Sequence, residues 1–262
     1  MSFSIDHIII LVQDLAIASA DYAELGFTVV PGGEHTGGAT HNALIAFADG
    51  VYLELIAFKR PTPEHFWWRY VATGEGLVDA ALLPTNIAED IAGIRGRGLP
   101  FDGPTPGGRV RPDGQEIAWL LGRPQTPDLP FLCADVTPRS LRVPSGAACQ
   151  HANGVVGIAN LTMAVSDFDA SVERYQALLD QAPTNSLPLD VTMLDDARTA
   201  TFTLGSATIT LAAPLHDDLQ SSLKQRLSEH GEGPYALALQ VDGEAEGYAL
   251  SMERTHGVPM TY

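Results

Sequence analysis

The sequence is poor in basic residues. Of its 262 residues, 15 are lysine or arginine and 32 are aspartate or glutamate, which gives a formal net charge of −17. A chain of this charge is repelled by nucleic acid and by anionic membrane surfaces. We therefore expect neither as a partner.

Cysteine is scarce as well. Cys133 and Cys149 are the only two, and their spacing matches neither a disulfide framework nor a metal knuckle. Two reduced thiols are expected. The alternative is a thiol–imidazole pair of Cys149 with His151, which rests on proximity in sequence alone.

Long apolar runs are missing too. Near the N-terminus the longest run is Ile8 to Val12, which follows Asp6 and has no basic leader. This pattern fits neither a signal peptide nor a membrane span, so a cytoplasmic protein is expected. The hydrophobic content of 45% is typical of a globular chain.

What the sequence does contain is a β-α-β-β-β unit at its start. Asp14 stands where an N-cap is expected before an apolar helical stretch, and Gly26 follows that stretch. A glycine-rich loop carries His35 and His41, and Asp49-Gly50 predicts a tight turn. The predicted elements are strand 5–12, helix 16–25, strand 27–30, strand 42–48 and strand 51–58.

The same unit recurs 153 residues later. This shift places Asp14 on Asp167 and Tyr22 on Tyr175, so the cap and one helix face agree. It also places His7 on Asn160, and the closing strand sets Glu54 opposite Thr210.

Two weaker copies complete the pattern. A shift of 72 residues starts a second unit and sets Asp79 at the position of His7; its closing strands are predicted as a hairpin around Pro112-Asp113-Gly114. A fourth copy starts at 235–243, continues through a predicted helix to His256-Gly257, and ends at Tyr262 before any hairpin.

These units predict an α+β fold of tandem βαβββ modules that pair into cupped mixed sheets, the last module being truncated. Residues 137–154 are rich in proline and glycine and lack periodicity, which is typical of a linker. The expected organisation is therefore a domain at 1–136, a linker at 137–154 and a second domain at 155–262.

The repeated pattern resembles the vicinal oxygen chelate superfamily, and within it the glyoxalase-like domain proteins. The resemblance rests on "DH" in the first strand, "THN" at 40–42, "YLELIAF", "RPDG", "LPF" and "HANG" at 151–154. It covers nearly the whole chain. Isomerases, epimerases, ring-cleaving dioxygenases and drug-sequestering binders share this scaffold, so the resemblance implies a fold more than a function.

The resemblance also implies one divalent metal held by inward residues of each unit's first and last strands. The first unit supplies His7 and Glu54, a pair suited to zinc, nickel, iron or manganese. The second unit offers Asp79 and, by alignment, Ala118, with Glu116 on the same face. A protein without metal is the alternative. The second half has no acid or imidazole at these positions.

Further residues are candidates for substrate contact. Thr40, His41 and Asn42 are expected at the mouth of the first cup, although turn chemistry alone also explains them. Trp67 is either an aromatic lid or a packing residue. Arg109 either orients a substrate carboxylate or flanks a turn.

We therefore expect a protein acting on a small oxygenated molecule, a lyase or isomerase in which Glu54 moves a proton beside metal-polarised oxygens. A ring-cleaving dioxygenase fits less well, because its two-histidine, one-carboxylate triad needs a second imidazole where Asp79 stands. The rival class is a non-catalytic small-molecule binder of the bleomycin-resistance type. A homodimer is a further expectation, motivated by the truncated fourth unit.

Overall fold

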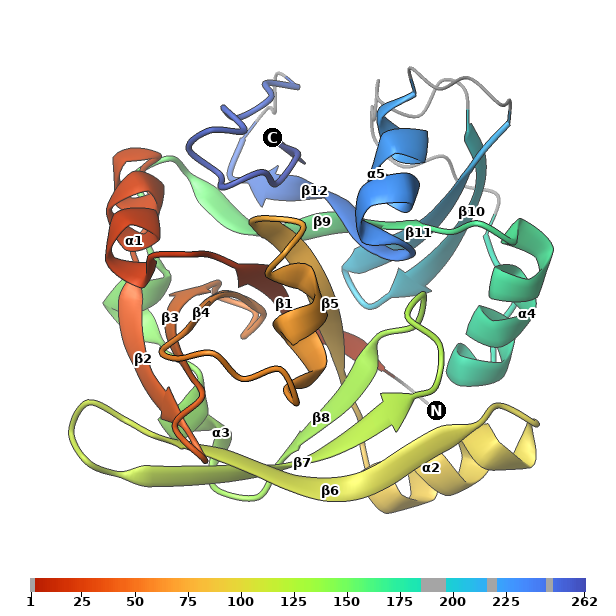
Figure 1. The fold of residues 1–262 in the computed structure, drawn as a ribbon, viewed down its shortest axis with the longest axis horizontal. Coiled ribbons are helices and arrows are strands. Elements are labelled where there is room, and N and C mark those ends of the chain that lie inside the picture. Colours follow the sequence, from red (N-terminus) through yellow and green to blue (C-terminus); the bar gives the residue numbers. More distant parts are fainter. Residues whose placement is uncertain (1–2, 185–196, 216–220, 244–246) are drawn as a thin grey trace.

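The computed structural model describes residues 3–184, 197–215, 221–243 and 247–262 (Figure 1). Eight strands form a closed barrel in the order β1-β4-β3-β2-β6-β7-β8-β5. The first unit comprises β1 (Ser4–Leu11), α1 (Leu15–Glu24), β2 (Val30–His35), β3 (Thr40–Ala46) and β4 (Tyr52–Phe58). The second comprises β5 (Gly76–Leu83), α2 (Ile87–Gly96), β6 (Phe101–Val110), β7 (Glu116–Pro124) and β8 (Phe131–Asp135).

Local chemistry explains the first unit. The Asp14 side chain accepts hydrogen bonds from the backbone N–H groups of Ala16 and Ile17, which fixes the start of α1 as predicted. The first strand of each unit pairs in parallel with the last, β1 with β4 and β5 with β8. The two units are thus joined edge to edge around one hollow.

Part of the glycine-rich stretch is a strand where a loop was predicted, and residues 36–39 form the turn that follows it. Strand β2 lies at Val30–His35 instead of 27–30, and it pairs with β6 of the second unit. A Cβ atom on Gly33, whose φ is +132°, would lie 2.0 Å from the Val110 carbonyl oxygen. Glycine is required there because only a bare backbone lets β2 approach β6 closely enough to close the barrel.

The closing strand of the second unit also differs from the prediction. The hairpin around Gly114 forms as expected, with Gly114 at a φ of +82°. However, it joins the unit's two middle strands, β6 and β7. The last strand is β8, so Ala118 and Glu116 lie one strand away from the position that the alignment gave them.

A second, five-stranded sheet follows in the order β10-β11-β9-β12-β13. Its elements are β9 (Val155–Ala164), α4 (Phe168–Leu179), β10 (Ala197–Leu204), β11 (Ala207–Pro214), α5 (Ser222–His230), β12 (Gly233–Val241) and β13 (Met260–Thr261). The helix predicted before His256 is absent from residues 247–262, which form turns and β13; residues 244–246 lie outside the described part. Positive φ angles at His256 and Gly257 favour turns there.

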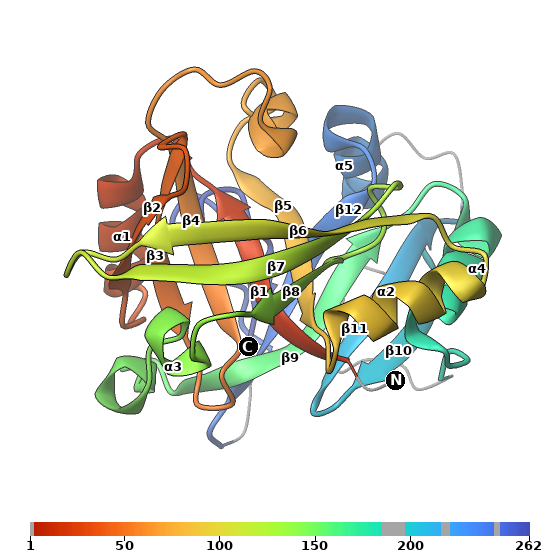
Figure 2. The ribbon, with the colours of Figure 1, turned by 90° about the horizontal axis from the view of Figure 1, so that it is seen from below.

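The two halves share one core. The largest cluster of buried apolar side chains includes Ile8 and Ile10 of the barrel together with Leu161 and Leu237 of the second sheet. The views in Figures 1 and 2 place β9 and β12 against the outer face of β1 and β5. The hydrophobic effect therefore joins the halves directly.

Residues 137–154, which were predicted as a linker, include short helices. They contain α3 (Arg139–Arg142) and the short 3-10 helix η2 (Gly146–Cys149). His151 accepts a hydrogen bond from the Thr28 N–H at Nδ1 and donates from Nε2 to the Ala46 carbonyl oxygen. Because both ring nitrogens serve the backbone, His151 is not a base for Cys149.

No helix among the described residues is long and apolar enough to cross a membrane.

Candidate active site

A cavity of about 440 Å³ lies inside the barrel, lined by residues of both units. Its lining includes Phe66 and Trp67 of the 3-10 helix η1 (Phe66–Tyr70), which lies in the β4–β5 connection, and Arg142 of α3. Figure 2 shows these two segments on opposite sides of the barrel. A volume of this size suits a small organic molecule. The cavity is therefore the candidate active site.

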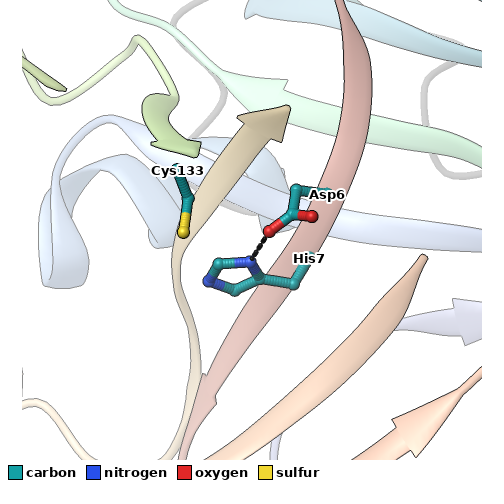
Figure 3. A group of neighbouring side chains, drawn as sticks. All are labelled: Asp6, His7 and Cys133. Carbon is teal, nitrogen blue, oxygen red and sulfur yellow. Dashed lines mark hydrogen bonds and ion pairs between the residues drawn. The ribbon is translucent and has the colours of Figure 1, made fainter. Parts of the chain in front are cut away.

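His7 projects from β1 into this cavity. Its Nδ1 donates to Asp6 Oδ2 at 2.7 Å (Figure 3), and its Nε2 lies 3.5 Å from Glu54 Oε2. The Tyr52 ring stacks on the imidazole with ring centroids 4.7 Å apart. These contacts fix both the orientation of the ring and the nitrogen that faces the cavity.

Asp6 holds the His7 ring in this orientation. The pairing of β1 with β5 shifts register between Ile5 and His7, a bulge that lets two consecutive side chains point the same way. Arg139 and Arg142 donate to the fully buried carboxylate at 2.5 and 2.8 Å. Burial disfavours its charge, but Arg142 and His7 outweigh burial and hold the pKa of Asp6 well below its usual range.

Glu54 lies on β4 and is buried in the cavity wall. The Asn42 Nδ2 donates to its Oε1 at 2.7 Å, and Nε2 of His35 lies 3.3 Å from the same oxygen. Burial alone would raise the pKa of Glu54. The adjacent His35, His7 and Asn42 lower it to about 2. The carboxylate is therefore ionised at neutral pH.

His35 completes this group; the sequence predicted it on a loop at the mouth of the cup and not among the metal ligands. It ends β2, its Nδ1 lies 3.0 Å from Thr40 Oγ1, and its Nε2 faces Glu54. In a glycine-rich segment interpreted as a loop, no periodicity assigned the ring to a face. The second imidazole of the cavity thus comes from the first unit and not from the position of Asp79.

The ligand atoms in the cavity show which residues fit the divalent metal that the resemblance implies. Among the described residues, Asp6, His7 and Cys133 bring three potential ligand atoms within 4.8 Å of one another (Figure 3). Asp6 is already saturated by arginines, and burial raises the pKa of the Cys133 thiol, so neither suits a cation. His7, His35 and Glu54 suit one better by their chemistry, because two imidazoles and an ionised carboxylate are borderline-metal ligands, but their ligand atoms do not all lie within 4.8 Å of one another in the described part of the chain. The Asp6 contact is also typical of the carboxylate behind a ligating histidine.

Asp79 lies elsewhere. Its Oδ2 accepts from the Trp67 indole N–H at 2.8 Å and pairs with Arg123 at 3.3 Å. Burial raises the pKa of Asp79, with Arg123 acting in the opposite direction. The residue fastens η1 to the barrel, and the structure does not bring it to His7 and Glu54.

The strand registers identify the second unit's equivalent of Glu54. Glu54 is the β4 partner of Ile9, and Phe131 is the β8 partner of Ala81, 72 residues after Ile9. An aromatic ring therefore occupies the second unit's last-strand position. Glu116 is exposed on β7.

The predicted substrate-contact residues lie on two different faces of the barrel wall. Thr40, Asn42, Trp67 and Arg109 line the cavity. His41 lies between Thr40 and Asn42 on β3, so its side chain points outward, where it lines a broader groove outside the barrel.

Comparison with known proteins now adds the family. The sequence profile described as the glyoxalase-like domain matches residues 5–179. The chain belongs to the glyoxalase-like domain family. No curated protein matches its sequence.

Solved structures confirm the predicted α+β fold of this glyoxalase-like protein. A hypothetical protein from Staphylococcus aureus is 13% identical, with 99% of this chain and 98% of that chain covered and a TM-score of 0.72. A mutant 4-hydroxymandelate synthase from Streptomyces coelicolor is 19% identical, with 93% and 72% covered and a TM-score of 0.65. At these identities the likeness establishes the fold alone.

The second sheet of the glyoxalase-like chain carries neutral residues at the positions that match His7 and Glu54. Asn160 Oδ1 accepts hydrogen bonds from Thr208 and Thr210 Oγ1, both at 2.8 Å, and its Nδ2 donates to Thr162. Thr210 pairs with Thr162 as Glu54 pairs with Ile9, so the predicted equivalence follows from the register. These neutral groups satisfy one another.

Proposed function

We propose that the barrel cavity is the active site of an isomerase, epimerase or lyase that moves a proton on a small oxygenated molecule. One observation carries this proposal. The ionised carboxylate of Glu54 lies between the Nε2 atoms of His7 and His35, at 3.5 and 3.3 Å, on the wall of a cavity of substrate size.

His7, His35 and Glu54 are the residues that would hold a divalent cation. When bound, the cation would act as a Lewis acid that polarises substrate oxygens and makes the neighbouring C–H group more acidic. The Asp6 carboxylate and the Thr40 hydroxyl hold the two rings by their Nδ1 atoms, which directs both Nε2 atoms toward Glu54.

Glu54 is the carboxylate placed to take the proton. Because its pKa is about 2, it is a weak base and works only on a carbon acid that is strongly activated. The buried surroundings that exclude water from Glu54 strengthen every charge–charge interaction in the cavity. This combination supports proton transfer next to a polarised oxygen.

A binder without catalysis is the competing function. Its support is the aromatic part of the wall, where Trp67, Trp119 and Phe131 present apolar surface to the cavity. Such a surface retains an apolar compound without any metal or base.

The two functions are separated by metal analysis and proton exchange. Protein loaded in turn with Zn²⁺, Ni²⁺, Fe²⁺ or Mn²⁺ is incubated in D₂O with small hydroxy-carbonyl compounds, and NMR follows the loss of the C–H signal. We expect one metal per chain and exchange of at least one compound, with both the metal and the exchange lost in His7→Ala and in Glu54→Gln. The matched control is His41→Ala, which lies outside the cavity. Metal-free protein that binds apolar compounds without exchange would establish the binder instead.

A further inference from the structure

Two guanidinium groups are buried in the described part of the chain, and they differ in their ion-pair partners. Arg109 and Arg142 are 4% and 2% exposed. Arg142 forms ion pairs with both Asp6 and Asp135. Among the described residues, Arg109 has no carboxylate within ion-pair distance, and its side chain makes one hydrogen bond, from Nη2 to the Arg142 carbonyl oxygen at 2.8 Å.

The Nε atom of Arg109 is buried and has no hydrogen-bond partner. Burial lowers the pKa of this arginine, and only the more distant Tyr52 and Glu54 act against it. An uncompensated buried charge is strongly unfavourable. Nε has almost no accessible surface, so a ligand in the cavity that Arg109 lines would compensate the charge of the guanidinium and would not bond to Nε itself.

The backbone makes room for this guanidinium. A Cβ atom on Gly32 of β2 would lie 2.9 Å from Arg109 Nη1 and 2.1 Å from Asn42 Oδ1. Any larger residue at position 32 would displace both side chains. The position of Arg109 is therefore built into the barrel wall.

The neighbours of Arg109 determine which part of a ligand it meets. His35 of β2 is its direct partner across the β2–β6 pair, so the two side chains leave adjacent strands about 5 Å apart. Trp119 pairs with Gly107 on the next strand, and Phe131 lies further along the wall. An anionic group on Arg109 would thus leave the adjoining carbons beside the His35–Glu54 group and the rest of the ligand on aromatic rings.

We infer that the cavity takes a small carboxylic acid, with its carboxylate paired to Arg109 and its apolar body on Trp119 and Phe131. This inference rests on the proposed function for the identity of the site, and it names the class of substrate. The planar fork of a guanidinium matches the two oxygens of a carboxylate. Glu54 does not prevent this, because His7, His35 and Asn42 already compensate its charge.

The test is isothermal titration calorimetry of the full chain with 3-phenylpropanoate, 3-phenylpropanamide and phenyl phosphate. We expect the carboxylate to bind roughly tenfold or more tightly than the amide, as a charge-assisted hydrogen bond requires. The preference should fall to about onefold in Arg109→Gln and to an intermediate value in Arg109→Lys, which keeps the charge but loses the fork. The control Arg111→Gln removes a half-exposed neighbour that pairs with Asp113 and should keep the full preference.

The outcomes separate the two proposals. A preference for the carboxylate that persists in metal-free protein and in Glu54→Gln supports the inference even where proton exchange fails. Equal affinity for acid and amide, no binding of the acid at millimolar concentration, or unchanged preference in a folded Arg109→Gln protein would overturn it. Tighter binding of phenyl phosphate would overturn the choice of carboxylate. Thermal unfolding midpoints identify any variant that fails to fold, for which Arg109→Lys gives the answer.

Discussion

The barrel and the second sheet place the same strand–helix unit in two settings. In the barrel, His7 and Glu54 face a hollow that is closed by the four strands of the second unit. In the second sheet, the matching Asn160 and Thr210 bond to each other, and α5 packs onto the same face through Leu223 beside Ala164 and Ala212. The comparison teaches that a site needs both a cavity and charged groups that no protein partner neutralises fully.

The largest expected contrast is in activity. Glu54→Gln removes the ionised carboxylate between two imidazoles, so the rate of solvent proton exchange should fall by about 100-fold or more. Thr210→Val removes the matching hydroxyl of the second sheet and should leave the rate unchanged. NMR in D₂O measures both, and an equal loss in the two variants would mean that the halves do not differ in function.

Stability should also distinguish the halves. Asp6→Asn removes the buried negative charge that Arg139, Arg142 and His7 share. We expect a loss of about 3 kcal/mol in the free energy of unfolding. Asn160→Ala in the second sheet removes the hydrogen bonds between its amide and the hydroxyls of Thr162, Thr208 and Thr210 and should cost about 1–3 kcal/mol. Urea unfolding gives both values. A larger loss for Asn160→Ala would reverse the assigned importance of the two networks.

The pH dependence sharpens the comparison further. The folded pKa of Glu54, about 2, lies below its ordinary value of 4.5, so its stabilising contribution is present above pH 4.5 and is lost as the pH falls toward 2. The difference in unfolding free energy between wild type and Glu54→Gln, at most about 3 kcal/mol, should shrink by roughly half between about pH 5 and about pH 3. The difference for Thr210→Val should stay constant, since no titrating group is removed.

The smallest effect concerns a feature that the halves share. Tyr22 and Tyr175 are both fully buried, and each donates its hydroxyl hydrogen to a backbone carbonyl of the other half, Thr255 at 3.0 Å and Asp128 at 2.9 Å. Each tyrosine-to-phenylalanine change should therefore cost about 1 kcal/mol. Thermal unfolding that shows clearly unequal losses would mean that the two helices are not equivalent supports.

Much of the fold could be predicted because local signals repeat. The caps Asp14 and Asp167 and the buried Tyr22 and Tyr175 mark the same helix twice. The glycine-rich β2 could not be predicted, because its glycines serve a close strand contact that is formed across the barrel. The strand β8 was missed because the preceding hairpin offered a complete but incorrect ending to the second unit.

The candidate site was predicted only where one strand determines a side chain's direction. His7 and Glu54 lie in regular apolar strands, so their shared cavity followed from the repeat. His35 and Asp79 could not be placed, because their positions depend on β2 reaching β6 and on Trp67 and Arg123 packing over β5. Such contacts join residues far apart in sequence.

The central claim is that His7, His35 and Glu54 form a cation site that the second sheet lacks. It is tested most directly by anomalous diffraction from crystals soaked in turn with Zn²⁺, Ni²⁺, Fe²⁺ and Mn²⁺. We predict one strong peak, bounded by the two Nε2 atoms and the Glu54 carboxylate. No peak in the barrel with any of these ions, or a peak at Asp6 and Cys133 or at Asn160 instead, would contradict the account.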